Sequence, residues 1–172
     1  MQRKLWLNAY SGIAAALLSS PSYCLTLTSN IPPNTSIPVT YTCDGKNISP
    51  RLSWAEAPNK TASFALIISD PDAPGGIFYH WVVYDIPNNI THLDEGESNF
   101  PVNTLMGISS WNVREYKGPC PPKGTTHHYI FTVYALDKST LKVAANANAK
   151  TILNALQNHI LASASFTATF GH

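Results

Sequence analysis

Charged residues are scarce in this sequence: Asp, Glu, Lys and Arg together make up 12% of its 172 residues. Eleven Lys and Arg residues oppose ten Asp and Glu residues, and the basic ones form neither a run nor a stripe. A nucleic-acid-binding surface needs a concentrated positive patch to attract phosphates. We therefore expect no nucleic-acid partner.

The chain also lacks a long apolar run near its N-terminus. The run at residues 13–18 is shorter than the roughly 20 residues that span a bilayer, which argues against the alternative of a membrane anchor. Arg3 and Lys4 precede this run and small residues follow it, which is the order of an export signal. We therefore predict a signal peptide over residues 1–24 and one domain over residues 25–172. The protein would be exported, either periplasmic or secreted, without a transmembrane span after processing.

Cysteines are few, and their spacing excludes some chemistry. The sequence has three, none of them in the C-x-x-C spacing of redox catalysts and zinc knuckles. Cys24 falls at the predicted cleavage region, which leaves Cys43 and Cys120 as a pair. In an exported protein we expect these two to form a disulfide, and two buried thiols are the alternative.

Familiar catalytic motifs are absent as well. The sequence contains no Gly-x-Ser-x-Gly elbow, no His-Glu-x-x-His motif and no phosphate-binding Walker loop. Cys120 lies between prolines, and a disulfide would prevent it from acting as a nucleophile. We therefore expect a protein that is not an enzyme and needs no cofactor. A hydrolase, or a metal site built from His and Asp side chains, remains an alternative.

Prolines and glycines are plentiful by contrast, and they divide the chain into short apolar segments. Thirteen prolines and nine glycines are typical of many turns between short strands. The continuous apolar run 64–68 predicts a central strand that is buried on both faces. Residues 149–162 carry the one convincing helical stripe, and residues 87–127 form a long, functional loop. The further predicted strands are 25–28, 37–41, 52–54, 80–86, 128–136 and 163–170.

This order of segments predicts a mostly β domain, a sandwich or barrel with one or two peripheral helices. In the strand 128–136, the alternation places Tyr129 on the same face as Phe131 and Val133. In the strand 80–86, it places His80 with Val82 and Tyr84.

Polar side chains gather in two proline-rich segments beside these strands. Asp70-Pro71-Asp72-Ala73-Pro74 follows the buried run, and residues 118–124 lead into His127-His128-Tyr129. Proline fixes the backbone and limits the freedom of its neighbours. If the strands are neighbours, the segments bring together Asp70, Asp72, His80, His127 and Tyr129. Such a pocket could hold an anion, bind a metal or perform acid–base chemistry.

The same segments resemble the phosphatidylethanolamine-binding protein family. The matching motifs are Asp70-Pro71-Asp72-Ala73-Pro74, His80-Trp81-Val82, and Gly118-Pro119-Cys120-Pro121-Pro122-Lys123-Gly124 with His127-His128-Tyr129. Residues 43–54 are similar to its bacterial Raf-kinase-inhibitor-like branch. The resemblance extends from about Leu25 to Phe170.

The resemblance implies a sandwich of two antiparallel sheets with a small pocket for phosphate, acetate or a phospholipid head group. It also implies a cis Ala73–Pro74 bond. His128 stands where many relatives have Arg, which would make the affinity for an anion depend on pH. The lining that it implies is Asp70, Asp72, His80, Pro122, His127 and Tyr129.

Two functions follow from this resemblance. The first is an exported, non-enzymatic binding protein for a small anionic or phosphorylated ligand. The second is inhibition or modulation of a partner kinase or protease through the loops at the mouth of the pocket, since members of the family inhibit kinases and serine carboxypeptidases.

Overall fold

The computed structural model describes residues 24–172, which form two antiparallel sheets and one α-helix. The larger sheet has the strand order β6–β4–β3–β7–β8, and the smaller sheet has the order β1–β2–β5. The strands are β1 (Thr26–Ser29), β2 (Leu52–Ala55), β3 (Ser63–Asp70), β4 (Phe78–Pro87), β5 (His92–Leu93), β6 (Leu105–Met106), β7 (Thr126–Leu136) and β8 (Ile160–Gly171). The predicted signal peptide lies outside the described residues, apart from Cys24.

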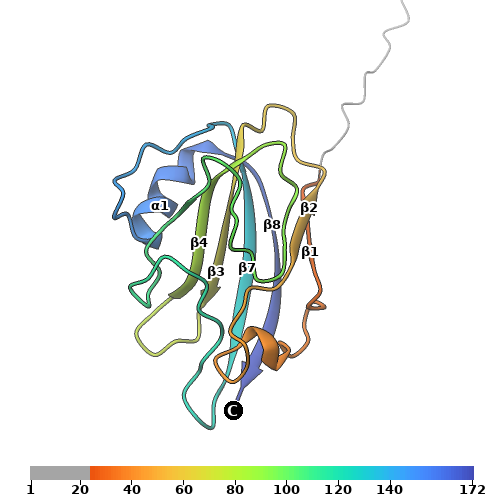
Figure 1. The fold of residues 1–172 in the computed structure, drawn as a ribbon, viewed down its shortest axis with the longest axis vertical. Helices are drawn as coiled ribbons and strands as arrows, with labels where there is room; N and C mark the ends of the chain where they lie inside the picture. Colours follow the sequence, from red (N-terminus) through yellow and green to blue (C-terminus); the bar gives the residue numbers. More distant parts are fainter. Residues whose placement is uncertain (1–23) are drawn as a thin grey trace, which may run out of the picture.

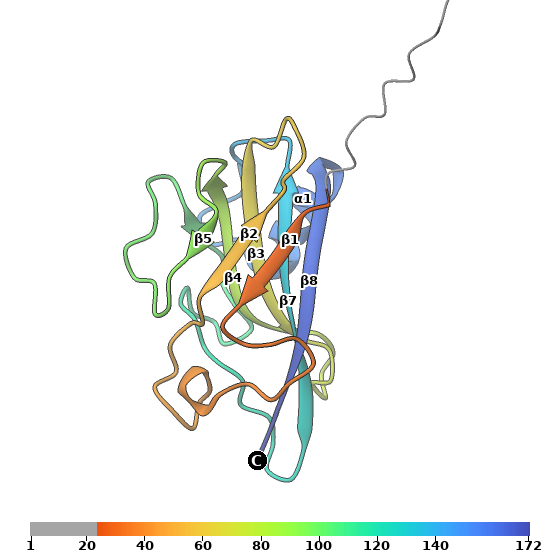
Figure 2. The same cartoon turned by 90° about the vertical axis from the view of Figure 1, so that its right-hand side faces the viewer.

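The five-stranded sheet is the middle layer of the molecule. The small sheet covers one face and helix α1 (Ala149–Leu156) covers the other (Figure 1). Turning the molecule brings β1 and β2 in front of β3 and β7 (Figure 2). In β3, Phe64, Leu66 and Ile68 pack toward the small sheet, while Ala65 and Ile67 pack toward α1. This arrangement confirms the prediction of a central strand buried on both faces.

Strand β4 contains two β-bulges, one near each end. Ile68 pairs with Trp81 and Ser69 with Tyr79, so His80 is an extra residue in β4. At the other end, Phe64 pairs with Ile86 and Leu66 with Val83, so β4 again has one residue more than β3. A bulge redirects side chains that strict alternation would place on the opposite face. The prediction that His80 shares a face with Val82 and Tyr84 is therefore wrong, because His80 contacts Tyr129 on the opposite face.

The C-terminal helix is shorter than predicted. Helix α1 ends at Leu156, a 3-10 turn η2 (Gln157–His159) follows, and β8 begins at Ile160 instead of continuing a helix to residue 162. Sheet pairing accounts for this, because Ile160 pairs with Leu136 and Asp137 donates its backbone N–H to the carbonyl of His159. Among residues 24–172, no helix is long and apolar enough to cross a membrane.

The predicted strand over residues 37–41 is wrong as well. Residues Val39–Tyr41 form a 3-10 turn, η1, which Pro38 precedes with φ −55° and ψ 138°. Pro38 cannot donate a ladder hydrogen bond, and Thr42 N–H closes the turn on the carbonyl of Val39. The long irregular segment is confirmed: between β4 and β7 the only regular elements are the two-residue strands β5 and β6.

Candidate functional site

The candidate site is a small pocket at the lower end of the five-stranded sheet in Figure 1, where β3 ends and β4 and β7 begin. Its volume is about 150 Å³. We call it the histidine pocket, and its walls are Asp70, Ala73, Pro74, Phe78, His80, Trp111, Cys120, Pro121, Pro122 and His127. The structure thus brings together four of the six predicted lining residues, namely Asp70, His80, Pro122 and His127.

One polar feature of the pocket is a buried pair between Asp70 and His127. Nδ1 of His127 lies 2.7 Å from Oδ2 of Asp70, and both residues are buried. The other carboxylate oxygen of Asp70 accepts the backbone N–H of Asp72 at 2.8 Å. A carboxylate only accepts at this distance, so Nδ1 of His127 carries the proton. The imidazole is therefore held in one orientation by a charge-assisted hydrogen bond.

His80 is oriented in the same manner, by a backbone carbonyl. The bulge in β4 places its ring against Tyr129, and Nδ1 lies 2.7 Å from the carbonyl oxygen of Lys117. Because a carbonyl only accepts, this nitrogen carries the proton. Trp111 Nε1 lies 3.4 Å from the same atom and therefore makes a packing contact rather than a second hydrogen bond. Burial lowers the pKa of His80 below its ordinary value, and the Lys117 carbonyl opposes this shift.

In both histidines the hydrogen-bonded ring atom is Nδ1, and no hydrogen bond within residues 24–172 engages Nε2. A neutral imidazole in this tautomer presents a hydrogen-bond acceptor at Nε2, whereas a protonated one presents a donor. No Lys or Arg side chain lines the histidine pocket. Lys123, which follows Pro122 directly in sequence, is exposed, and Lys117 forms an ion pair with Glu115 at 3.1 Å. Positive charge inside the pocket must therefore come from the two imidazoles.

Tyr129 and Asp72 belong to the surroundings of the pocket and do not line it. Tyr129 is fully buried behind His80, with the two ring centroids 5.3 Å apart. Burial raises the pKa of its phenol far above the usual range, and the Asp70 carboxylate adds to this effect. The alternation in β7 that places Tyr129 with Phe131 on the core face explains its position.

Asp72 fastens the β3–β4 loop to β7. Its Oδ2 accepts the backbone N–H of His128 at 2.8 Å and lies 2.7 Å from Nδ1 of the same residue. These bonds, the backbone one first, hold the pKa of the Asp72 carboxyl below its ordinary value. Both side chains are substantially exposed, and neither lines the histidine pocket. His128 is thus committed to Asp72.

The β3–β4 loop reverses its direction without a cis peptide bond. All peptide bonds of the described residues are trans, so the predicted cis Ala73–Pro74 bond is wrong. The trans isomer is the more stable one for most X–Pro bonds. The reversal occurs instead at Gly76, which has φ +101° and donates its N–H to the carbonyl of Ala73. Glycine reaches this backbone region without strain.

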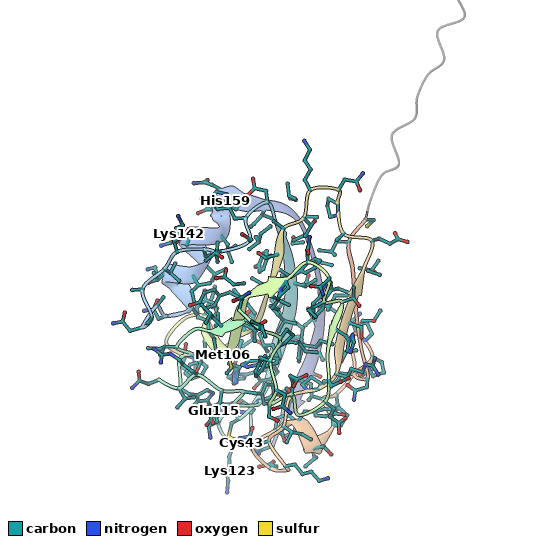
Figure 3. All side chains as sticks on the ribbon, turned by 45° about the horizontal axis from the view of Figure 1, so that its top comes forward. Cys43, Met106, Glu115, Lys123, Lys142 and His159 are labelled. Carbon is teal, nitrogen blue, oxygen red and sulfur yellow. A yellow bond between two sulfur atoms is a disulfide. The ribbon has the colours of Figure 1, made fainter. Side chains whose placement is uncertain are left out.

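A disulfide supports the proline-rich wall of the pocket. Cys43 and Cys120 are bonded, as predicted, with their Cα atoms 5.4 Å apart. The Cys43 N–H donates to the carbonyl of Pro119, and the Gly118 N–H donates to Oδ1 of Asn47 at 2.7 Å. A Cβ at Gly118 would overlap the carbonyl oxygen of Tyr41, so the two segments approach closely only with glycine there. Cys43 and Lys123 lie near one end of the molecule, while Lys142 and His159 lie near the other (Figure 3).

Two aromatic side chains that were not among the predicted site residues form one wall of the pocket. Phe78 and Trp111 pack edge to face with their centroids 5.0 Å apart, and Phe78 lies 5.2 Å from the ring of His80. Trp111 is 41% exposed although it is large and apolar. It belongs to the long segment that was expected to be functional from its length, but no spacing rule pointed to this residue.

The pocket residues do not form a cluster of metal ligands. Within residues 24–172, the only group of three or more potential ligands that converge is Cys43, Cys120 and His172. Its two sulfur atoms are bonded to each other. In the pocket, Asp70 occupies Nδ1 of His127, and Asp72 contacts His128 outside the walls. The arrangement is suited to hydrogen bonding with a ligand, with rigid prolines and aromatic rings around two oriented imidazoles.

A comparison with protein families decides the relationship of the chain. A family model described as phosphatidylethanolamine-binding protein matches residues 27–171. The chain belongs to the phosphatidylethanolamine-binding protein family. It is 41% identical over 132 residues to the UPF0098 protein YbhB of Escherichia coli, with 74% of this chain and 84% of that protein covered.

Solved structures of family members have the same fold. The crystal structure of Escherichia coli YbcL, described as a new member of the mammalian family, has a TM-score of 0.81 at 30% identity. It covers 86% of this chain and 98% of that one. A phosphatidylethanolamine-binding protein homologue from Chlamydia trachomatis has a TM-score of 0.80 at 32% identity and covers 88% and 99% of the two chains. The predicted sandwich of two antiparallel sheets is thereby confirmed.

Proposed function

We propose that this protein is an exported, non-enzymatic binding protein whose histidine pocket holds a small oxyanion. The observation that carries the proposal is the pair of imidazoles with Nδ1 bonded to the protein and Nε2 left for a ligand. A pocket of about 150 Å³ suits a phosphate-like or carboxylate group rather than a large molecule.

Binding rather than catalysis is supported by what surrounds the imidazoles. Cys120, the only residue in the pocket wall with a nucleophilic side chain besides the histidines and Asp70, is in a disulfide. Nucleophilic catalysis needs an activated group within hydrogen-bond reach of a base. The fixed walls of Pro74, Pro121 and Pro122 favour selection of a ligand by size.

Proton transfer is coupled to binding in this proposal. Because its pKa is lowered by burial, the His80 imidazole is mainly neutral near neutral pH and offers only an acceptor at Nε2. Monohydrogen phosphate can donate its own proton to that atom, whereas sulfate cannot. We therefore expect phosphate to bind more tightly than sulfate near neutral pH. As the pH falls, protonation of His80 provides a donor, so the affinity for sulfate rises and the difference becomes smaller.

Isothermal titration calorimetry with phosphate and sulfate tests this proposal. His80→Ala and His127→Ala should each weaken phosphate binding by roughly tenfold or more, the loss of one charge-assisted hydrogen bond. His128→Ala is the matched control, because this imidazole lies outside the pocket and should leave the affinity unchanged. Circular dichroism establishes that each variant is folded. Equal affinities for phosphate in the His80 variant and the unmodified protein would refute the site.

Export rests on separate support. Residues 1–24 have the order of an export signal, and the Cys43–Cys120 disulfide suits an oxidising compartment. Determining the N-terminal residue of the protein recovered from the periplasm or the medium of a bacterial host tests this part. Intact protein confined to the cytoplasm would contradict it.

A second candidate function is the inhibition of a kinase or protease by docking of the pocket mouth. Ile77 in the β3–β4 loop is 58% exposed, and Trp111 in the pocket wall is also exposed. Exposed apolar and aromatic side chains of this kind are enriched at protein interfaces. Pull-down experiments with an Ile77→Ser variant would separate this function from oxyanion binding, since Ile77 does not line the histidine pocket.

A further inference from the structure

A second cavity lies at the opposite end of the five-stranded sheet. Its volume is about 390 Å³, larger than that of the histidine pocket. The walls are formed by the residue before β3, the end of β4, strand β6 with its preceding loop, and the loop after β7. We call it the Asp85 cavity, and its lining residues are Ala62, Asp85, Pro87, Asn88, Asn103, Leu105, Ser139 and Thr140.

Asp85 occupies a special backbone position in this cavity. It lies at the second β-bulge of β4 and has φ +55°, in the left-handed region. Among residues with a Cβ, Asn and Asp tolerate this region best, although at some cost in free energy. Bulges and backbone strain of this kind occur frequently at functional sites. Here the bulge interrupts the alternation at a carboxylate that lines a cavity.

The charge of Asp85 has no protein partner. The residue is 3% exposed, and its Oδ1 accepts the backbone N–H of Leu141 at 3.0 Å. Within residues 24–172, no nitrogen of a Lys, Arg or His side chain lies within 4.0 Å of this carboxylate, and Oδ2 has no hydrogen-bond partner and is accessible to solvent in the cavity. Burial raises the pKa of the Asp85 carboxyl, which the Leu141 N–H partly opposes. An unpaired buried carboxylate is costly, and a cationic ligand would compensate it.

The remaining walls indicate which kind of cation fits. Ala62, Pro87 and Leu105 provide apolar surface, whereas the other lining residues besides Asp85 are neutral and polar. Asn88 donates its side-chain N–H to the carbonyl of Thr61 at 3.1 Å, which leaves its amide oxygen available as an acceptor. A bare Ca²⁺ ion takes six to eight oxygen ligands in a tight shell, and Mg²⁺ requires a small octahedral one. A cavity of this size with one carboxylate and an apolar wall instead suits an ammonium group on a short carbon chain.

We propose that the Asp85 cavity binds a small aliphatic amine, with the ammonium group on the Asp85 carboxylate and the methylenes against Pro87 and Leu105. This site is independent of the histidine pocket. The two lie at opposite ends of β4, and His80 and Asp85 are separated by about 17 Å along an extended strand.

The test is a titration of the protein with 1,4-diaminobutane, followed by nuclear magnetic resonance of the backbone amides. Saturable shifts should appear at Asn88, Asn103 and Ser139, and they should be absent with 1,4-butanediol, which has the same length but no charge. Asp85→Asn should weaken binding of the diamine by roughly tenfold or more. Asn retains an acceptor for the Leu141 N–H and tolerates φ +55°, so the variant removes the charge and preserves the local structure.

Two further variants make the outcome decisive. Asp137→Asn removes a half-exposed carboxylate that already pairs with His159 near the same end of the molecule, and it should leave the affinity unchanged. Ser139→Trp fills the mouth of the cavity while Asp85 is intact, and it should abolish the shifts. Equal weakening by Asp137→Asn would show surface attraction only and overturn the proposal. The proposal is also overturned if the diamine causes no saturable shifts, or if CaCl₂ reproduces them.

Discussion

The two ends of strand β4 differ in how the protein compensates a buried ionisable residue. At each end a β-bulge brings an ionisable residue to a cavity, His80 at one and Asp85 at the other. At the first end every buried ionisable side chain that lines the pocket has a hydrogen-bond partner: Asp70 holds His127, and the Lys117 carbonyl holds His80. At the second end the Asp85 carboxylate has a single neutral donor, the Leu141 N–H.

From this difference we expect the histidine pocket to be stable without a ligand and the Asp85 cavity to be stabilised by a bound cation. Paired groups cost little to bury and keep their geometry, so the histidine pocket is fixed before a ligand arrives. An unpaired buried carboxylate destabilises the folded state until a cation binds. The following experiments test the contrast, beginning with the largest expected effect.

Removal of the disulfide should have the largest effect. The Cys43–Cys120 bond joins residues 77 positions apart, and closure of such a loop stabilises the folded state by about 4 kcal/mol. We expect the double variant Cys43→Ser, Cys120→Ser to lose most of this amount in urea denaturation and to bind phosphate more weakly, because Cys120 belongs to the pocket wall. The unmodified protein, with its disulfide intact, is the control in both measurements. A double variant as stable as the control would show that the hydrogen bonds at Pro119 and Asn47 suffice.

The buried carboxylate of the histidine pocket should have the next largest effect. Asp70→Ala leaves the Nδ1–H of His127 and the N–H of Asp72 without an acceptor, which we expect to lower the free energy of unfolding by about 3 kcal/mol. Asp72→Ala removes a comparable pair at the surface and should lower it by less than about 1 kcal/mol. Denaturation of both variants at the same pH measures the difference. Similar losses would mean that burial of the Asp70–His127 pair carries no special weight.

The sequence permitted much of the fold to be predicted, because its signals are local. The apolar run in β3, the alternation in β7 and the proline-rich loops each reflect a preference of a few neighbouring residues. The predicted end of the helix at residue 162 was wrong because the pairing of Ile160 with Leu136 outweighed the helical stripe of apolar residues. A strand was predicted in place of the turn at Val39–Tyr41 because the alternation of apolar and polar residues continues past Pro38.

The site was predictable to a smaller extent. Asp70 and His127 lie near the ends of two clearly predicted strands, and the resemblance to the family implied that these strands are neighbours. The bulges at His80 and Asp85 have no signal in the pattern of residues 80–86, because they arise from the pairing of β4 with β3. Tyr129 and Asp72 were assigned to the lining for their chemistry, whereas packing put one in the core and the other at the surface. Trp111 reaches the pocket through an irregular loop that no periodicity describes.

The second bulge provides the smallest effect, and its sign is opposite to that at Asp70. Burial raises the pKa of the Asp85 carboxyl above the 3.8 of the unfolded chain. Between these two values the folded state binds more protons than the unfolded one, so this group makes the protein less stable as the pH rises through that window. Asp85→Asn does not titrate, and near neutral pH it should raise the free energy of unfolding by about 1 kcal/mol. Below pH 3.8 both states of Asp85 are protonated, and the gain should vanish. Urea denaturation of the variant and the unmodified protein at both pH values measures this difference. A loss of stability at neutral pH would mean that the Asp85 charge is compensated within the protein, and the two ends of β4 would then follow the same rule.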